Sequence, residues 1–330
     1  MEKYLVDVFT GVRPSHTLTI ANYIGAIKPI IDLQKKGARP VVFVADLHAL
    51  TDNEPKQIGQ YIQEIAADYI ALGLDPEKTS IFTQSAIREE VLTLTAYLAR
   101  LISVAELLRV PTLKDKLKSG ARPETANALL FLYPVLMAAD ILIQRAQRVP
   151  VGEDQLAHLE VSRELARRFN QKYKTVFPLP QPYVTKALRI MSLDGKGKMS
   201  KSNPDGAFLL TDTPAHIRAK IKKAATATEG NITDVLKSHC SIIEHIGTEK
   251  ENELMGAIIK KHKKGEKVMG EFKTLLGDCV ERFLVGFQEK RAQVLGNKNF
   301  VPLVLEKGNG FARENASRTL ELVEKAMKER

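Results

Sequence analysis

Short apolar runs alternate with longer amphipathic segments in the first third of the chain. The short runs, rich in β-branched and aromatic residues as strands are, cover 5–10, 40–46 and 80–84. Between them, apolar residues recur every three or four positions over 20–31 and 58–72, which predicts helices, and a further helix is expected from about Glu89. Such alternation predicts a parallel α/β sheet with right-handed crossovers, whose ligands bind at the carboxyl ends of the strands.

The middle of the chain is less regular. Pro29 is expected to kink or bound the first helix. Residues 114–125 are polar and contain glycine and proline, so they predict a loop, whereas 126–143 and 154–169 predict helices. The segment 177–183 contains three prolines, which indicates a connector or an edge strand.

Helical patterns prevail from about Thr213 to the end, and glycines mark the expected breaks. These glycines are Gly230, Gly247, Gly265 and Gly296. We therefore predict two domains: an α/β domain over 1–207, with an inserted helical segment at about 105–145, and an α-helical domain over 208–330.

Composition adds modest constraints. The chain has 330 residues, of which 44% are hydrophobic and 27% charged, as in ordinary globular proteins. Its net charge of +10 is spread over both predicted domains, which is compatible with a nucleic-acid partner and equally with a solvated basic surface. The two cysteines, Cys240 and Cys279, are too few and too far apart for a disulfide framework or a cysteine metal site, so a reducing, cytoplasmic location is expected.

No signal peptide or membrane span is expected. The N-terminus lacks an apolar h-region. The most apolar window, 126–143, is interrupted by Asn127, Pro134 and Asp140 and predicts a buried core helix. We therefore expect no membrane association.

Two lysines stand close together in the sequence Lys198-Met199-Ser200-Lys201-Ser202, called the lysine motif below. Gly195 and Gly197 precede it and loosen the backbone. Two compact ammonium charges on a loop can follow the negative charge that develops on a departing pyrophosphate. A solvated basic turn is the alternative interpretation.

The junction between the first strand and the first helix is a candidate phosphate site, because N–H groups at a helix start are unpaired. Thr19 and Asn22 would lie on one face of the first helical turn and offer neutral donors. The same residues could instead form an ordinary N-cap. Neither a GxGxxG nor a P-loop pattern is present in this junction.

Asp140 lies in the apolar sequence Leu136 to Ile143, where a carboxylate is costly to bury without a partner. It is therefore either a specificity residue that accepts a hydrogen bond from a ligand, or a structural residue at a helix end or in a core ion pair.

Together, these motifs resemble the tryptophanyl-tRNA synthetases, a family of class I aminoacyl-tRNA synthetases. Thr19-Ile20-Ala21-Asn22 and the lysine motif are similar to the two class I signatures. Further short sequences resemble those of the family and occur in the same order along the chain: Pro14-Ser15, Ala21 to Ala26, Asp46 to Thr51, Tyr133 to Asp140, Val149 to Gln155, and Arg189 to Leu193.

The resemblance implies a Rossmann-like parallel sheet, a C-terminal helical tRNA-binding domain and a set of site residues. For ATP it implies Arg13, Pro14, Ser15, Ala21, Asn22, Gly152, Glu153, Asp154, Ile190, Lys198, Met199, Ser200, Lys201 and Ser202. For tryptophan it implies Asp140, which would accept the indole N–H, with Phe9, His48, Tyr133, Met137, Val149, Val151 and Gln155. Thr19, Asn22, Lys198 and Lys201 would be the catalytic residues.

The implied activity is the condensation of L-tryptophan with ATP to tryptophanyl-adenylate, followed by transfer to the 3′ end of tRNA(Trp). Mg²⁺ would arrive with ATP, since no dedicated carboxylate cage is visible in the sequence. A homodimer is also implied by the family. Arg13, His16 and Ala21 depart from its usual first motif and are expected to alter ATP affinity.

Two other interpretations stay open at this point. One is a tyrosyl-type or other adenylate-forming enzyme of the same fold. The other is a non-catalytic paralogue that binds tryptophan, ATP or RNA. The sequence does not indicate which residues would read the anticodon.

Overall fold

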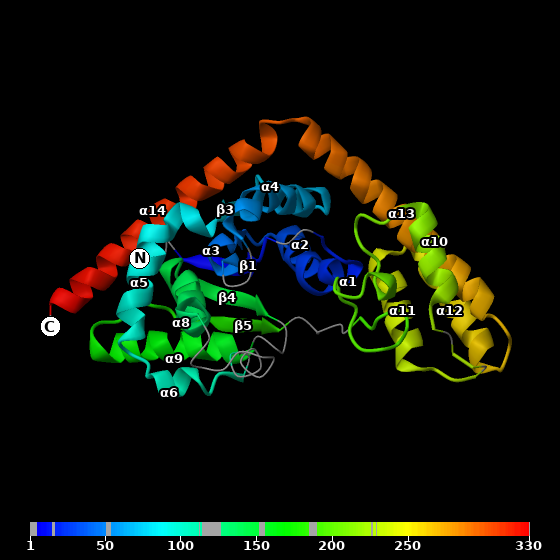
Figure 1. Cartoon of the computed structure of the whole chain (residues 1–330), viewed down its shortest axis with the longest axis horizontal. Coiled ribbons are helices and arrows are strands. Elements are labelled where there is room, and N and C mark those ends of the chain that lie inside the picture. The colour runs from blue at the N-terminus through cyan, green and yellow to red at the C-terminus, as the bar shows by residue number, and fades with distance from the viewer. Residues whose placement is uncertain are drawn as a thin grey trace.

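The computed structural model describes residues 5–14, 17–50, 54–111, 113, 127–151, 156–184, 190–225, 227–228 and 230–329. Figure 1 shows two halves, a sheet with its helices and a cluster of helices, bridged by two long helices that meet at an angle. None of the described helices is long and apolar enough to cross a membrane.

Five parallel strands form the sheet, in the order β3-β2-β1-β4-β5. They are β1 (Val6–Val12), β2 (Pro40–Val44), β3 (Ser80–Thr83), β4 (Ala146–Val151) and β5 (Gln181–Val184). The three strands predicted from the apolar runs are confirmed. The proline-rich segment provides an edge strand, β5, which is one of the two alternatives expected for it.

Strand β4 was not predicted, because Pro150 argues against an internal strand. The structure accommodates it because pairing between β4 and β1 ends at Arg148. Pro150 lies beyond that ladder, where β4 pairs with β5 alone and Pro150 aligns with Tyr183. Pro150 therefore has a ladder partner on one side only, as a strand proline requires.

Helices cover both faces of the sheet (Figure 1). They are α1 (Ile20–Asn22), the π-helical turn η2 (Tyr23–Ile27), α2 (Lys28–Lys35), α3 (Asp46–Ala49), α4 (Pro55–Ala71), the 3₁₀ turn η3 (Gln84–Ile87), α5 (Arg88–Ala99), α6 (Val104–Leu107), α8 (Ala128–Ile143) and α9 (Leu156–Lys172). Pro29 does interrupt regular α-helix: it lies in the first turn of α2, directly after η2, where its missing N–H is tolerated.

Alternate residues of β2 belong to two separate apolar cores. Val42 and Val44 pack with α4 and the C-terminal helices, whereas Val41 and Phe43 pack with α5, α8 and α9. The sheet is therefore buried on both faces, as its uninterrupted apolar sequence predicts.

The C-terminal half is helical, as predicted. After the turn η5 (Pro204–Gly206) come α10 (Pro214–Lys223), α11 (Asp234–Ile246), α12 (Glu249–Lys263), α13 (Met269–Gly296) and α14 (Phe300–Lys328). Of the expected glycine breaks, Gly230, Gly247 and Gly265 lie between these helices, and Gly296 is the last residue of α13. Gly230 and Gly265 adopt positive φ angles of 77° and 89°, a conformation that glycine adopts without strain.

The last helix, α14, leaves the other C-terminal helices and packs against the sheet half (Figure 1). The Asn309 side chain accepts a hydrogen bond from the N–H of Thr83 at 2.9 Å, and Arg313 donates to the carbonyl of Ala86 at 3.0 Å. Gly308 lies against the backbone of Ile81 with no room for a Cβ. The division at 207/208 stays a prediction. The α14 helix, which that prediction places in the second domain, packs mainly against elements of the first.

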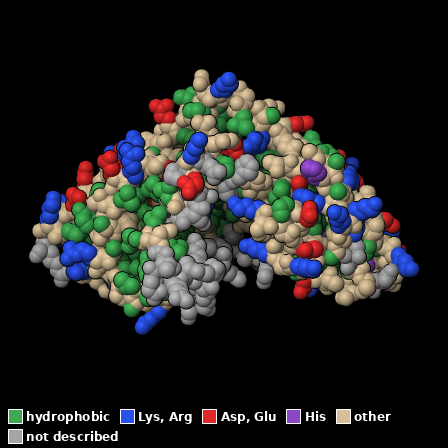
Figure 2. All heavy atoms as spheres, in the orientation of Figure 1, with side chains coloured by type: hydrophobic (Ala, Val, Ile, Leu, Met, Phe, Trp, Pro, Cys, Tyr) green, Lys and Arg blue, Asp and Glu red, His purple; other side chains and the backbone are tan. Residues whose placement is uncertain are grey.

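Lysine and arginine side chains are scattered over both halves in the view of Figure 2, mixed with acidic ones. This distribution agrees with the even spread of charge along the sequence. The outline in that view is indented between the two halves.

Candidate active site

Asp140 is a deeply buried carboxylate of the predicted site. It lies on α8 and only 2% of it is exposed. Both of its oxygens accept hydrogen bonds from Gln84 Nε2, at 2.8 and 2.9 Å, and its Oδ2 lies 2.9 Å from Nε2 of His48. The partner that a buried carboxylate requires is therefore present within the protein.

The environment of Asp140 acts on its pKa in two directions. Burial raises the pKa of the carboxyl, because a low-dielectric surrounding disfavours the charged form, and nearby Asp46 raises it further. Hydrogen bonds from His48 and Gln84 act in the opposite direction, and the net direction is upward. The contacts with His48 and Gln84 thus favour the ionised form of the carboxyl, which can accept a hydrogen bond from a ligand.

His48 and Gln84 come from the carboxyl ends of neighbouring strands. His48 lies on α3, directly after β2, and Gln84 opens η3, directly after β3. Asp46 joins the two loops, since its Oδ1 accepts hydrogen bonds from the N–H groups of Ser85 at 2.9 Å and Leu47 at 3.2 Å. This is the edge of the sheet where the alternation of strands and helices predicted a ligand site.

Apolar side chains predicted to surround the amino-acid substrate lie in one core cluster with the helix that carries Asp140. They are Phe9, Tyr133, Val149 and Val151, all buried, and Met137, which is partly buried. The Phe9 ring stacks on Phe43 with 5.0 Å between ring centroids. Tyr133 packs edge-on against His158, and its hydroxyl lies 3.5 Å from Nε2 of that histidine.

The lysine motif follows a tight backbone turn. Met191 and Lys198 form an antiparallel bridge, and the N–H of Ser192 donates to the carbonyl of Gly197 at 2.9 Å. Gly195 and Gly197 have φ angles of 74° and 90°, which residues with a Cβ rarely adopt.

Within the motif, Met199 is 3% exposed and anchors the loop in the core, and Ile190 is buried beside it in the same cluster. Lys198, Lys201 and Ser202 are exposed. With the described residues, the two ammonium groups make no hydrogen bond or ion pair. Ser200 and Ser202 share a hydrogen bond between their hydroxyls at 2.8 Å.

The segment after the lysine motif pairs with the start of α1. The N–H of Ile20 donates to the carbonyl of Phe208 and that of Leu210 to the carbonyl of Leu18, both at 2.9 Å. Ile20 and Phe208 are 188 positions apart in the chain, yet these hydrogen bonds connect the segment after the lysine motif with the start of α1.

Thr19 and Asn22 form a capping box, as the structural alternative for this segment expected. The Thr19 hydroxyl donates to Asn22 Oδ1 at 3.0 Å, and Thr19 is 1% exposed. Asn22 is exposed, and its amide Nδ2 makes no hydrogen bond with the described residues. Of the pair, Asn22 Nδ2 is thus the donor that an incoming phosphate could meet.

Arg13 lies where β1 ends, and its guanidinium donates to the carbonyl of His48 at 3.4 Å. This contact connects a residue predicted to bind ATP with a residue predicted to bind the substrate tryptophan. Pro14 is buried and Ala21 is half-buried. Ser15, His16, Gly152, Glu153, Asp154 and Gln155 lie outside the described residues.

Sequence reasoning missed Gln84 and Asp46 as members of this site. Both follow predicted strands, at 80–84 and 40–46, so their position at the carboxyl edge was available as a signal. Their contact with Asp140, which is 56 positions from Gln84, requires the fold.

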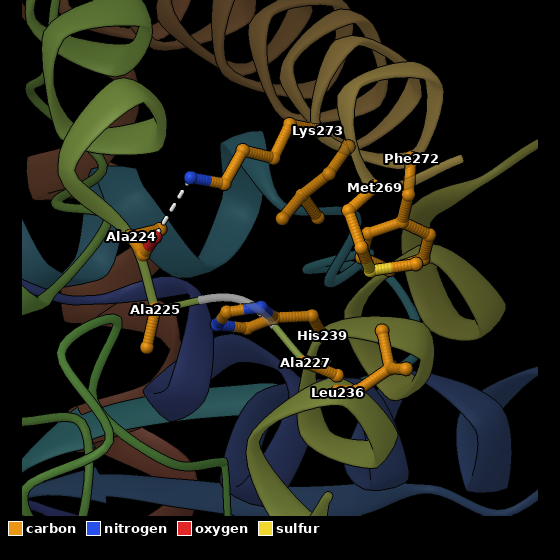
Figure 3. A pocket seen from close by; sticks show the side chains of 9 residues that line it. Ala224, Ala225, Ala227, Leu236, His239, Met269, Phe272 and Lys273 are labelled. Carbon is orange, nitrogen blue, oxygen red and sulfur yellow. Dashed lines mark hydrogen bonds between the residues drawn. The ribbon is translucent and has the colours of Figure 1, made fainter. Parts of the chain in front are cut away.

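A small pocket elsewhere is lined by residues of the helical half, and none of the predicted site residues lines it. In Figure 3, Lys273 reaches across it to the carbonyl of Ala224, and the His239 ring lies in the same pocket. His239 is 3% exposed, and its Nε2 has no hydrogen-bond partner among the described residues. Among those residues, no group of three or more His, Cys, Asp or Glu could hold a metal ion.

Comparison with known proteins agrees with this arrangement. The family described as tRNA synthetases class I (W and Y), where the letters denote tryptophan and tyrosine, matches residues 2–293. The chain belongs to this family. The α/β fold with a parallel sheet and C-terminal helices, predicted from sequence, is confirmed for this synthetase.

Relatives and solved structures resemble the synthetase over nearly its whole length. Tryptophan–tRNA ligase of Caulobacter vibrioides is 40% identical over 96% of this chain and 94% of its own length. The tryptophan–tRNA ligase of Chlamydia caviae is 35% identical, also over 96% of this chain and 94% of its own length. The structure of tryptophanyl-tRNA synthetase from Campylobacter jejuni with ADP and tryptophan covers 98% of this synthetase and 99% of its own chain, at 30% identity and a TM-score of 0.83.

Proposed function

We propose that this synthetase activates L-tryptophan with ATP, forming tryptophanyl-adenylate and pyrophosphate, and transfers the tryptophanyl group to the 3′ end of tRNA(Trp). The observation that carries the proposal is the buried Asp140 carboxylate beside a cluster of apolar and aromatic side chains. An indole has one hydrogen-bond donor and no acceptor, so one carboxylate in apolar surroundings suits it. The names of the relatives support the same substrate.

In the first step, the substrate carboxylate attacks the α-phosphorus of ATP in line, and the bond to pyrophosphate breaks. No protein nucleophile is required, so catalysis consists of positioning and charge stabilisation. Lys198 and Lys201 are exposed and make no ion pair with the described residues, which leaves their charges available for the leaving pyrophosphate. Asn22 and Arg13 contribute donors from the start of α1 and the end of β1.

The other residues predicted to bind ATP differ in how deeply their side chains are buried. Ile190 and Met199 hold the lysine loop in the core, and Ser200 and Ser202 offer hydroxyls beside the two lysines. Mg²⁺ enters as part of the ATP complex and supplies additional positive charge to the phosphates. In the second step, the ribose hydroxyl of the tRNA displaces AMP from the adenylate.

The partners follow from the same proposal. The tRNA anticodon region binds the C-terminal helices, whose run Lys260, Lys261, Lys263 and Lys264 offers phosphate contacts. The synthetase acts as a homodimer in the cytoplasm.

The two other interpretations lose support. A tyrosyl pocket should offer a second polar partner for a phenol, which both donates and accepts, whereas Met137, Val149 and Val151 are apolar. A non-catalytic role is disfavoured by the intact lysine motif.

The experiment is ATP–pyrophosphate exchange by the purified chain with each of the twenty amino acids in turn. The proposal expects exchange with tryptophan and little with the others. Exchange with tyrosine would support the tyrosyl alternative, and exchange with none of them the non-catalytic one.

A further inference from the structure

Gln84 is buried completely, with 0% of it exposed, although it bears a polar amide. Both ends of that amide are occupied. Its Oε1 accepts a hydrogen bond from the backbone N–H of His48 at 3.2 Å, and its Nε2 donates to the Asp140 carboxylate at 2.8 and 2.9 Å. These partners fix the amide orientation, because a flipped amide would place its oxygen against the carboxylate.

An ionised carboxylate has about four lone-pair sites for hydrogen bonds. The single Nε2 of Gln84 contacts both oxygens of Asp140, and His48 Nε2, when that nitrogen carries the proton, donates to Oδ2. At least one acceptor site of the carboxylate is therefore left. An indole ring has one donor, which such a site can accept.

The turn that carries Gln84 is itself held from two sides. The N–H of the preceding residue, Thr83, donates to Asn309 Oδ1 on α14, and the N–H of the following residue, Ser85, donates to Asp46 Oδ1, both at 2.9 Å. Gln84 therefore has little freedom to follow the carboxylate if Asp140 rotates, and the carboxylate is instead held in place by Gln84.

We propose that Gln84 is a positioning residue for tryptophan selectivity: it fixes the Asp140 carboxylate so that a remaining acceptor site receives the indole N–H. The proposal rests on the function proposed above. It assigns a role to a side chain that acts through Asp140 and does not itself need to touch the substrate.

The test compares L-tryptophan with β-(3-benzothienyl)alanine, in which sulfur replaces the indole N–H. The ratio of kcat/KM values for these two substrates in ATP–pyrophosphate exchange reports the hydrogen bond to the carboxylate. Gln84→Met keeps the side-chain length but removes the donor. We expect it to lower the ratio about ten- to a hundredfold, the usual effect of a hydrogen bond to a charged group.

Gln144→Met is the matched control, because Gln144 is also 0% exposed and fully hydrogen-bonded, to Ala312 and Asn315, outside the site. It should leave the ratio within about twofold of the unmodified synthetase, whatever it does to stability. Should Gln84→Met not fold, Gln84→Asn keeps a buried amide but is too short to reach both oxygens, and should lower the ratio in the same way.

A second comparison separates positioning from a direct role. In a chain that already carries Asp140→Asn, adding Gln84→Met should change the ratio by less than about threefold, because the group it orients has gone. An unchanged ratio in Gln84→Met alone, with tryptophan-dependent exchange intact in the unmodified chain, overturns this inference only. Absence of that exchange in the unmodified chain overturns the proposed function instead.

Discussion

The N–H of Ile20 donates to the carbonyl of Phe208, and this hydrogen bond of 2.9 Å joins the start of the first helix to the segment that follows the lysine motif. Phe208 and Ile20 are both fully buried, so the connection is made inside the core. Movement of the lysine loop is thereby restricted at its C-terminal end, while Lys198 and Lys201 stay exposed. The two segments predicted to bind ATP are therefore connected through the core.

Lys201→Ala should reduce ATP–pyrophosphate exchange about a hundred- to a thousandfold, because it removes a charge that opposes the one developing on pyrophosphate. Tryptophan binding should be nearly unchanged. The chain contains no Trp residue, so the fluorescence of the bound amino acid can be followed without a tryptophan background from the protein.

Lys196→Ala is the control for this experiment, since Lys196 is an exposed lysine of the same loop outside the motif. It should retain near-normal exchange. Equal losses in the two variants would mean that the general charge of the loop matters and that Lys201 has no specific role.

Gly308→Ala should lower the free energy of unfolding by about 2 kcal/mol or more, because a Cβ at this position would overlap the backbone of Ile81. Gly310→Ala, two residues further along α14, has open space around its Cβ and should instead raise the stability by about 1 kcal/mol through helix propensity. Urea denaturation of the two variants measures both effects. Similar stabilities would show that α14 does not pack tightly on β3 in solution.

His239 predicts a pH dependence of stability. Burial and the nearby charge of Lys273 lower the pKa of this histidine to about 4, from an unfolded value near 6.5. Between these values the unfolded chain binds a proton that the folded chain does not, so stability decreases as the pH falls from about 6.5 to about 4. The contribution is on the order of 3 kcal/mol at the acid end.

Replacing His239 with Gln should therefore flatten the stability profile over that pH range. His216→Gln is the control, because the His216 side chain is 68% exposed. Chemical denaturation at several pH values gives the comparison. A slope that His239→Gln leaves unaltered would assign the acid sensitivity to other groups.

Most of the fold could be predicted from the sequence, because short apolar runs marked the strands and apolar residues every three or four positions marked the helices. The strands at 6–12, 40–44 and 80–83 and the C-terminal helices follow directly from those patterns. Strand β4 was missed because Pro150 is admissible in an inner strand only where pairing on one side has already ended. The return of α14 to the sheet depends on contacts between residues more than 200 positions apart, such as Thr83 with Asn309, which no local pattern contains.

The site residues stay a prediction, and the structure shows only which of them lie together. Residues known from motifs, such as Asp140 and His48, lie within hydrogen-bond distance of each other, as one site requires. Gln84 belongs to a short turn without a distinctive pattern, and its role depends on a carboxylate that only folding brings near it. The roles assigned to the lysines and to Asn22 remain predictions for experiment.

The central claim is that Asp140 recognises the indole N–H of tryptophan, and exchange assays with Asp140→Ala test it most directly. The unmodified synthetase should prefer tryptophan over phenylalanine by about 10⁴–10⁵ in kcat/KM, because phenylalanine leaves a buried acceptor unpaired. Asp140→Ala, shown by circular dichroism to be folded, should lose most of that preference. The same preference in the variant as in the unmodified synthetase would contradict the account and leave Asp140 with a structural role.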